Sequence, residues 1–81
     1  MRFVYYSAEW CAPCKRVRPW VEAVAGEFGA ELETVDIGEE PVDGVMSVPA
    51  LDIVVGGELL KRIVRWSSAP ALARGVEEVM G

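Results

Sequence analysis

The chain has 81 residues, 52% of them hydrophobic, and a formal net charge of −5 at pH 7. This length allows one small domain, residues 1–81, and excludes two, while the acidic balance argues against direct nucleic-acid binding. No apolar run is long enough to cross a bilayer, and the start, MRFVYY, lacks the pattern of a signal peptide because polar residues follow at once. We therefore expect a cytoplasmic protein with no membrane contact.

The first half of the chain predicts a strand, a helix and a second strand. Residues 2–6 (RFVYY) are aromatic and β-branched, which is typical of a strand. Apolar residues recur at helical spacing over residues 11–28. Pro19 lies inside this stretch and should kink the helix without ending it, because the pattern continues beyond it. Residues 31–37 (ELETVDI) alternate polar and apolar side chains and predict the second strand.

The second half predicts a loop, a hairpin and a final helix. Residues 38–47 (GEEPVDGVMS) form the loop, with room for one helical turn. Two strands, 50–55 and 58–64, flank a Gly-Gly pair that supplies the positive φ angles of a tight hairpin turn. Residues 67–81 begin with capping serines and an early proline, which favour a helix start. The order is β-α-β-β-β-α, with a parallel first pair of strands and an antiparallel hairpin.

The stretch AEWCAPCKRVRPW (8–20) contains both cysteines, at the start of the first predicted helix. The unpaired N–H groups and the positive dipole end of that helix should stabilise a Cys11 thiolate and lower its pKa. Cys14, one turn further on, can attack a mixed disulfide formed by Cys11. Pro13 suits the first helical turn. The bases that follow, Lys15, Arg16 and Arg18, form either a basic rim that favours the thiolate or an ordinary solvated face.

Metal binding is the main chemical alternative for the cysteine pair. Zinc needs four ligands, and the chain has no histidine and only two cysteines. A zinc site shared between chains, or copper(I) on the two sulfurs, stays open. A purely structural pair is disfavoured by the polar and basic neighbours. We therefore favour dithiol chemistry and expect no bound metal or cofactor.

Two motifs resemble those of the thioredoxin family. AEWCAPCK (8–15) is similar to the family's active site, usually Trp-Cys-Gly-Pro-Cys-Lys, and SVPAL (47–51) is similar to its second signature, a Val/Ile-Pro after the middle loop. Pro19 matches the kink proline of the family's active-site helix. The resemblance implies an α/β minimal thioredoxin fold: a four-stranded mixed sheet in order 2-1-3-4, with both helices on one face. The family's usual first strand and helix have no counterpart in this sequence, whose size is close to that of glutaredoxins.

The resemblance also implies roles for individual residues. Cys11 would be the attacking thiol and Cys14 the resolving thiol. Pro49 would follow a cis peptide bond beside the cysteines, with an ordinary trans turn proline as the alternative. The substrate surface would comprise residues next to the cysteines and in the second motif: Trp10, Ala12 (in place of the usual glycine), Pro13, Val48 and Pro49.

Three positions depart from the family pattern. Tyr5 stands where thioredoxins commonly bury an aspartate that helps take the proton from the resolving thiol. Asp52 interrupts an apolar strand, so it either replaces that proton acceptor or points to solvent on an uncovered sheet face. Trp66, in the loop before the last helix, is either an exposed aromatic for partner docking or a core residue. That loop lacks the acidic pair with which glutaredoxins hold glutathione.

Taken together, these features predict a monomeric thiol–disulfide oxidoreductase that reduces protein disulfides. It would bind no cofactor and would receive electrons from NADPH through a thioredoxin reductase. The loop Trp66-Ser67-Ser68 faintly resembles the Trp-Ser-Gly loop of the small redoxins that reduce ribonucleotide reductase. This resemblance suggests ribonucleotide reductase as a partner. The alternatives are a non-catalytic binding subunit, a glutaredoxin-like glutathione-dependent reductase, and an oxidant or isomerase outside the cytoplasm.

Overall fold

The computed structural model describes residues 1–42, 44, 45 and 47–80. Its elements follow the predicted order: β1 (Arg2–Ser7), α1 (Ala12–Glu27), β2 (Glu31–Asp36), β3 (Ala50–Val55), β4 (Glu58–Val64) and α2 (Ala69–Met80). The strands form one sheet in the order β2-β1-β3-β4. β1 pairs in parallel with β2, and the other two pairs are antiparallel. The predicted mixed sheet and its strand order are therefore confirmed.

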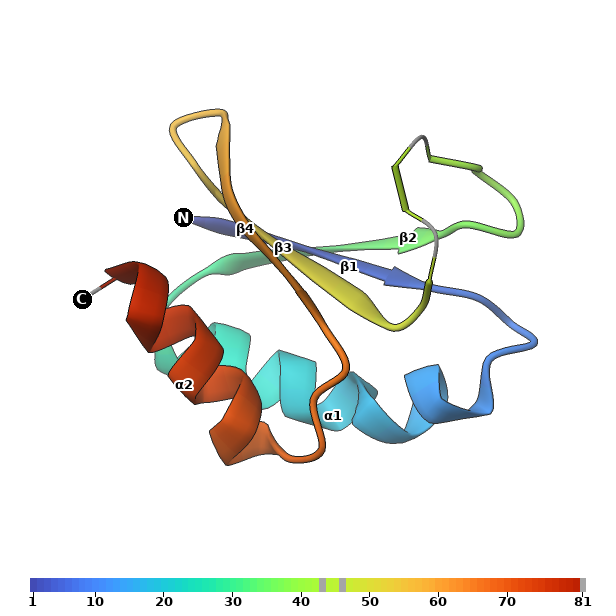
Figure 1. Cartoon of the computed structure of the whole chain (residues 1–81), viewed down its shortest axis with the longest axis horizontal. Coiled ribbons are helices and arrows are strands. Elements are labelled where there is room, and N and C mark those ends of the chain that lie inside the picture. The colour runs from blue at the N-terminus through green and yellow to red at the C-terminus, as the bar shows by residue number, and fades with distance from the viewer. Residues whose placement is uncertain (43, 46, 81) are drawn as a thin grey trace.

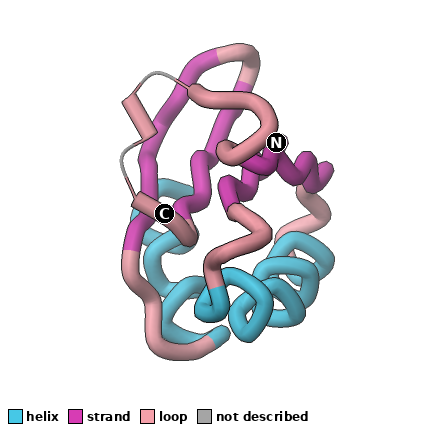
Figure 2. Tube along the Cα trace, turned by 90° about the vertical axis from the view of Figure 1, so that its right-hand side faces the viewer, coloured by secondary structure: helices cyan, strands magenta, loops and turns pink. Residues whose placement is uncertain are grey.

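Both helices cover the same face of the sheet, as Figures 1 and 2 show. β1 and β3 send every second side chain toward the helices, because side chains alternate along a strand. The main core between these layers contains residues from four elements, among them Phe3, Tyr5, Leu51, Ile53, Val21, Val24, Leu72 and Val76. Each fully buried side chain of this size contributes about 1.5–3 kcal/mol, so this layer carries most of the stability.

The other face of the sheet has a smaller apolar cluster. Val4, Tyr6, Val35 and Ala50 form it, and Val42 and Val45, from the segment between β2 and β3, pack against it. Adjacent tyrosines of β1 thus serve opposite faces: Tyr5 faces the helices and Tyr6 faces away from them.

The connections largely follow the predicted local chemistry. α1 continues through Pro19 to Glu27. Gly56 and Gly57 both adopt positive φ angles, 60° and 82°, as the predicted hairpin turn requires. The Ser68 hydroxyl accepts a hydrogen bond from the Ala71 N–H at 3.2 Å, which caps the start of α2. A register shift between Ile53 and Val54 was not predicted.

The loop between β2 and β3 opens with a tight turn. The N–H groups of Glu39 and Glu40 both donate to the Asp36 carbonyl, at 3.2 Å and 2.8 Å. Residues 43 and 46, which belong to the loop where one helical turn was expected, lie outside the described residues, as does residue 81 of the last predicted helix. Across the described part of the chain, neither helix is long and apolar enough to span a membrane.

Candidate active site at the start of helix α1

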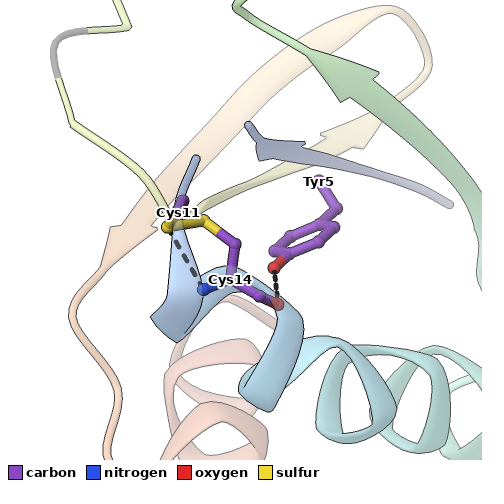
Figure 3. The surroundings of a disulfide bond; sticks show 3 residues. All are labelled: Tyr5, Cys11 and Cys14. Carbon is purple, nitrogen blue, oxygen red and sulfur yellow. Dashed lines mark hydrogen bonds between the residues drawn. A yellow bond between two sulfur atoms is a disulfide. The ribbon is translucent and has the colours of Figure 1, made fainter. Parts of the chain in front are cut away.

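The cysteine pair sits where the chain leaves β1 and enters α1 (Figure 3). Cys11 is the N-cap of α1, with an extended backbone, and the Cys14 N–H donates to the Cys11 sulfur at 3.2 Å. The two residues form a disulfide with their Cα atoms 5.3 Å apart. The cap position arises because the turn before it closes with a bond from the Cys11 N–H to the Ala8 carbonyl. Cys11 thus meets an unpaired helix donor, as the sequence predicted.

The electrostatics at this helix end favour negative charge. The first turn of α1 contains no acidic residue. Lys15, Arg16 and Arg18 follow on its exposed side. The helix dipole and these cations act in the same direction.

Tyr5 supports the turn that carries Cys14. Its hydroxyl donates to the Cys14 carbonyl at 2.6 Å (Figure 3), and its side chain is only 1% exposed. Burial raises the pKa of Tyr5 to about 12, although the Arg18 cation acts in the opposite sense. Tyr5 is therefore a neutral hydrogen-bond donor at physiological pH. The sequence marked this position as unusual but did not predict the contact.

The second motif adopts the expected backbone. The Val48-Pro49 peptide bond is cis. Both residues are half-buried, and Val48 packs against the core cluster that contains both cysteines. Arg65 follows Val64, which pairs with Ala50, so it lies at the same end of the sheet as Pro49. Arg65 has a φ of 60°, a region that costs a non-glycine residue about 1 kcal/mol.

The two tryptophans proposed for the substrate surface differ sharply in exposure. Trp10 is 73% exposed, and Ala12 and Pro13 beside it are also exposed. Trp66 is only 8% exposed and packs edge-on against Tyr5, with ring centroids 6.4 Å apart. The expectation that Trp66 is an exposed docking residue was therefore wrong. It is a core residue, and its indole Nε1 has no hydrogen-bond partner within the described residues.

Asp52 also departs from both of its predicted roles. It lies between Leu51 and Ile53, which face the helices, so its side chain points to the opposite face from the cysteines. It is 4% exposed and hence does not face solvent. Arg62 donates to both carboxylate oxygens, at 2.6 Å and 2.9 Å, and the Tyr6 hydroxyl donates at 3.0 Å. Asp52 is thus part of a structural polar network, not the proton acceptor of the thiols.

This network changes the titration of its neighbours. Burial, followed by the hydrogen bond to Asp52, raises the pKa of Tyr6. The hydrogen bonds to Asp52 also raise the pKa of Arg62. Elsewhere in the described ranges, no group of three or more His, Cys, Asp or Glu side chains is placed to hold a metal ion. The arrangement as a whole is a two-thiol site at a helix N-terminus, which can be oxidised and reduced reversibly.

Comparisons with known proteins define this class of site further. The family model "Thioredoxin" matches residues 1–78. Thioredoxin from Streptomyces clavuligerus is 40% identical over 77 residues, covering 88% of this chain and 71% of its own length. Thioredoxin 1 from Chlorobaculum tepidum is 36% identical over 76 residues, with coverages of 86% and 70%. The structure of thioredoxin 1 from Thermosipho africanus has a TM-score of 0.85 at 25% identity, covering 99% of this chain and 94% of that one.

A thioredoxin fold with a Cys-x-x-Cys pair at a helix start defines a thiol–disulfide oxidoreductase. The chain belongs to the thioredoxin family. Members of this family carry no bound cofactor, and a thioredoxin reductase provides their indirect route to NADPH. A bifunctional thioredoxin reductase/thioredoxin from Mycobacterium leprae is 34% identical over 83 residues, covering 95% of this chain and 18% of its own length.

The Asp52–Arg62 pair yields a first prediction, on stability. Arg62→Met leaves a buried carboxylate with Tyr6 as its remaining partner, so the free energy of unfolding should fall by about 2 kcal/mol. This is less than for a fully buried pair, because the Arg62 side chain is 29% exposed. Urea denaturation of Asp52→Leu, Arg62→Met and the double variant measures this, and the double variant should lose less than the sum. A slower disulfide reduction by Asp52→Asn at unchanged stability would contradict the structural role.

Tyr5 yields a second prediction, on alkaline pH. Its pKa is raised in the folded protein from 10.0 to about 12, so its contribution to stability is complete below about pH 10 and is lost as pH rises to about pH 12. The loss should amount to about 2–3 kcal/mol. Urea unfolding of the oxidised protein between about pH 9 and about pH 12 should show this loss of unfolding free energy. Over the same range, the unfolding free energy of Tyr5→Phe should fall by about 2–3 kcal/mol less than that of wild type. An identical pH dependence in both proteins would refute this assignment.

Proposed function

We propose that this chain reduces disulfides of partner proteins, with Cys11 as the attacking thiol and Cys14 as the resolving thiol. The observation that carries the proposal is the N-cap position of Cys11, whose sulfur accepts the Cys14 N–H at 3.2 Å. In the reduced protein, the same donor and the helix dipole would stabilise a Cys11 thiolate and lower its pKa. Cys14 lies within the helix and has no comparable advantage.

The reaction proceeds by two thiol–disulfide exchanges. The Cys11 thiolate attacks one sulfur of the substrate disulfide, a Cys11–substrate bond forms, and the other substrate sulfur leaves as a thiolate. Cys14 then loses its proton and attacks the Cys11 sulfur. The Cys11–Cys14 disulfide forms, and the second substrate sulfur leaves as a thiolate. The two electrons thus pass from the dithiol to the substrate, which takes up two protons.

The substrate would dock on the surface around the pair. Trp10 offers the largest exposed apolar side chain near the cysteines, and the smaller side chains of Ala12 and Pro13 beside it are also exposed. The Val48 backbone, just before Pro49, would pair with an extended substrate segment. Main-chain pairing of this kind tolerates many substrate sequences, which suits a general protein-disulfide reductant.

The partners follow from this chemistry. The oxidised pair would return to a thioredoxin reductase for electrons, and ribonucleotide reductase is proposed as one physiological acceptor. We place the cycle in the cytoplasm, where thiols are kept reduced and a catalytic pair is the expected use of two cysteines. The chain would act as a monomer, with residues 1–81 as one catalytic domain.

Cysteine variants test the proposal directly. With dithiothreitol as the electron source, the wild-type protein should accelerate insulin-disulfide reduction, and Cys11→Ser should fall to the rate without protein. Cys14→Ser should accumulate a mixed disulfide, visible by non-reducing electrophoresis and mass spectrometry. Ser67→Ala, an exposed loop position, serves as the control and should behave as wild type. A wild-type protein without activity would favour the non-catalytic binding subunit, whereas activity that survives Cys11→Ser would refute the dithiol mechanism.

Trp10 gives a separate prediction about substrate docking. Trp10→Ala should lower kcat/KM for a protein disulfide about 5- to 10-fold, the effect of removing an aromatic contact residue worth about 1 kcal/mol or more. Its 73% exposure means that stability should stay within about 0.5 kcal/mol of wild type. Met80→Ala, which removes another exposed apolar side chain at the end of α2, is the matched control. Equal kcat/KM values for the two variants would remove Trp10 from the docking surface.

A further inference from the structure

A hollow lies beside Cys14, between β1, α1 and the end of β2. Its volume is about 140 Å³, and it is open to solvent on one side. The lining includes residues with titratable side chains from β1 and the following turn, from α1 and from the end of β2. They are Tyr5, Glu9, Cys14, Lys15, Arg18 and Asp36. A water molecule occupies about 30 Å³ in the liquid, so the hollow has room for several waters between these polar groups.

The reaction needs a proton acceptor at this place. Cys14 is 2% exposed, so bulk solvent has little direct access to its thiol. Resolution of the mixed disulfide nevertheless requires the Cys14 thiolate. The Tyr5 hydroxyl lies beside Cys14, but it donates a hydrogen bond to the Cys14 carbonyl at 2.6 Å. Its pKa of about 12 also keeps it neutral. The acceptor must therefore be another group.

Asp36 places a carboxylate in the lining of the hollow that Cys14 also lines. It is the last residue of β2 and pairs with Ser7, and this register brings it to the wall of the hollow that contains Cys14. The Gly38 N–H donates to Asp36 Oδ1 at 2.8 Å, which holds the half-buried carboxylate in one orientation. Asp36 Oδ2 accepts no hydrogen bond from the described part of the chain. One carboxylate oxygen is thus left for water in the hollow.

The other charged groups around the hollow support this assignment. Lys15 and Arg18 on α1 place positive charge at the same wall, which offers both carboxylates of the lining opposite charges nearby. Glu9 is the second carboxylate of the lining, but it is exposed and lies in the turn before Cys11, where solvent competes for it. The fixed, half-buried Asp36 is therefore the better-placed base.

We propose that Asp36 accepts the proton of the Cys14 thiol, through water in this hollow, when Cys14 resolves the mixed disulfide. The inference rests on the proposed dithiol mechanism and adds its proton acceptor. The Cys14 S–H bond breaks and the proton passes by way of water to the Asp36 carboxylate. The Cys14 sulfur then attacks Cys11, the Cys11–substrate bond breaks, and the substrate thiolate leaves with its electron pair. Asp36 afterwards returns the proton to solvent.

The resolving step can be observed alone with Ellman's reagent. Attack by Cys11 releases one thionitrobenzoate, and resolution by Cys14 releases the second, so stopped-flow absorbance separates the two phases. The rate of the second phase should fall about 10- to 100-fold at pH 7 in Asp36→Asn, the lower part of the range for proton-transfer catalysis. Asp36→Asn keeps the Oδ1 acceptor for Gly38, and its stability is checked by urea unfolding. Asp36→Glu should recover part of the rate.

The pH profile distinguishes proton transfer from a structural effect. With a carboxylate base, the second-phase rate of wild type should change little between about pH 5.5 and about pH 7.5. In Asp36→Asn it should rise about tenfold per pH unit, because the rate then follows the small fraction of Cys14 thiolate. Glu9→Gln, on the same hollow, and Glu39→Gln, outside its lining, are the controls and should keep the wild-type profile.

Failure of this inference is distinct from failure of the proposed function. If wild type releases both thionitrobenzoates and Asp36→Asn shows the same flat profile and rate, the dithiol mechanism stands and Asp36 is not the acceptor. The same holds if Glu9→Gln, and not Asp36→Asn, produces the steep profile. If wild type itself never releases the second thionitrobenzoate, the dithiol mechanism fails.

Discussion

The contact between the Cys11 sulfur and the N-terminus of α1 is the interaction on which the proposed chemistry depends. Cys11 caps α1, and the Cys14 N–H points at its sulfur from 3.2 Å. The first N–H groups of a helix have no acceptor within the helix. A thiolate accepts hydrogen bonds from them more strongly than a neutral thiol does, so this position stabilises the thiolate. The sheet and both helices serve this contact by holding the turn between β1 and α1 in place. Tyr5 adds to this support from below, through its hydrogen bond to the Cys14 carbonyl.

Two neighbouring residues of β1, Tyr5 and Tyr6, make contacts on opposite faces of the sheet. Tyr5 faces the helices, supports the cysteine turn and packs against Trp66. Tyr6 faces the other side and donates to Asp52, which Arg62 neutralises. Each hydroxyl has one partner, so burial of the two polar groups is compensated on both faces. The redox site and the polar network are therefore separated by the thickness of the sheet, and variants in one should leave the other unchanged.

Much of this architecture could be predicted because its signals are local. Periodicity placed both helices and four strands, the Gly-Gly pair placed the hairpin, and the spacing of the two cysteines placed them at a helix start. The role of Asp52 was missed, and Trp66 was left open between the surface and the core, because each depends on which sheet face a residue occupies and on a distant partner. The proposed proton acceptor, Asp36, was not singled out either, although its signal was present: a parallel pairing of the first two strands brings the end of the second strand beside the cysteine turn.

The most direct measurement of the central claim is the titration of Cys11 in the reduced protein, followed by the pH dependence of its alkylation in the Cys14→Ser variant. If the helix end and its N–H donor stabilise the thiolate, the pKa of Cys11 will lie well below that of a free cysteine, about 8.5. A Cys11 thiol that titrates like free cysteine would contradict the account, because nothing else in the site would then select it as the nucleophile.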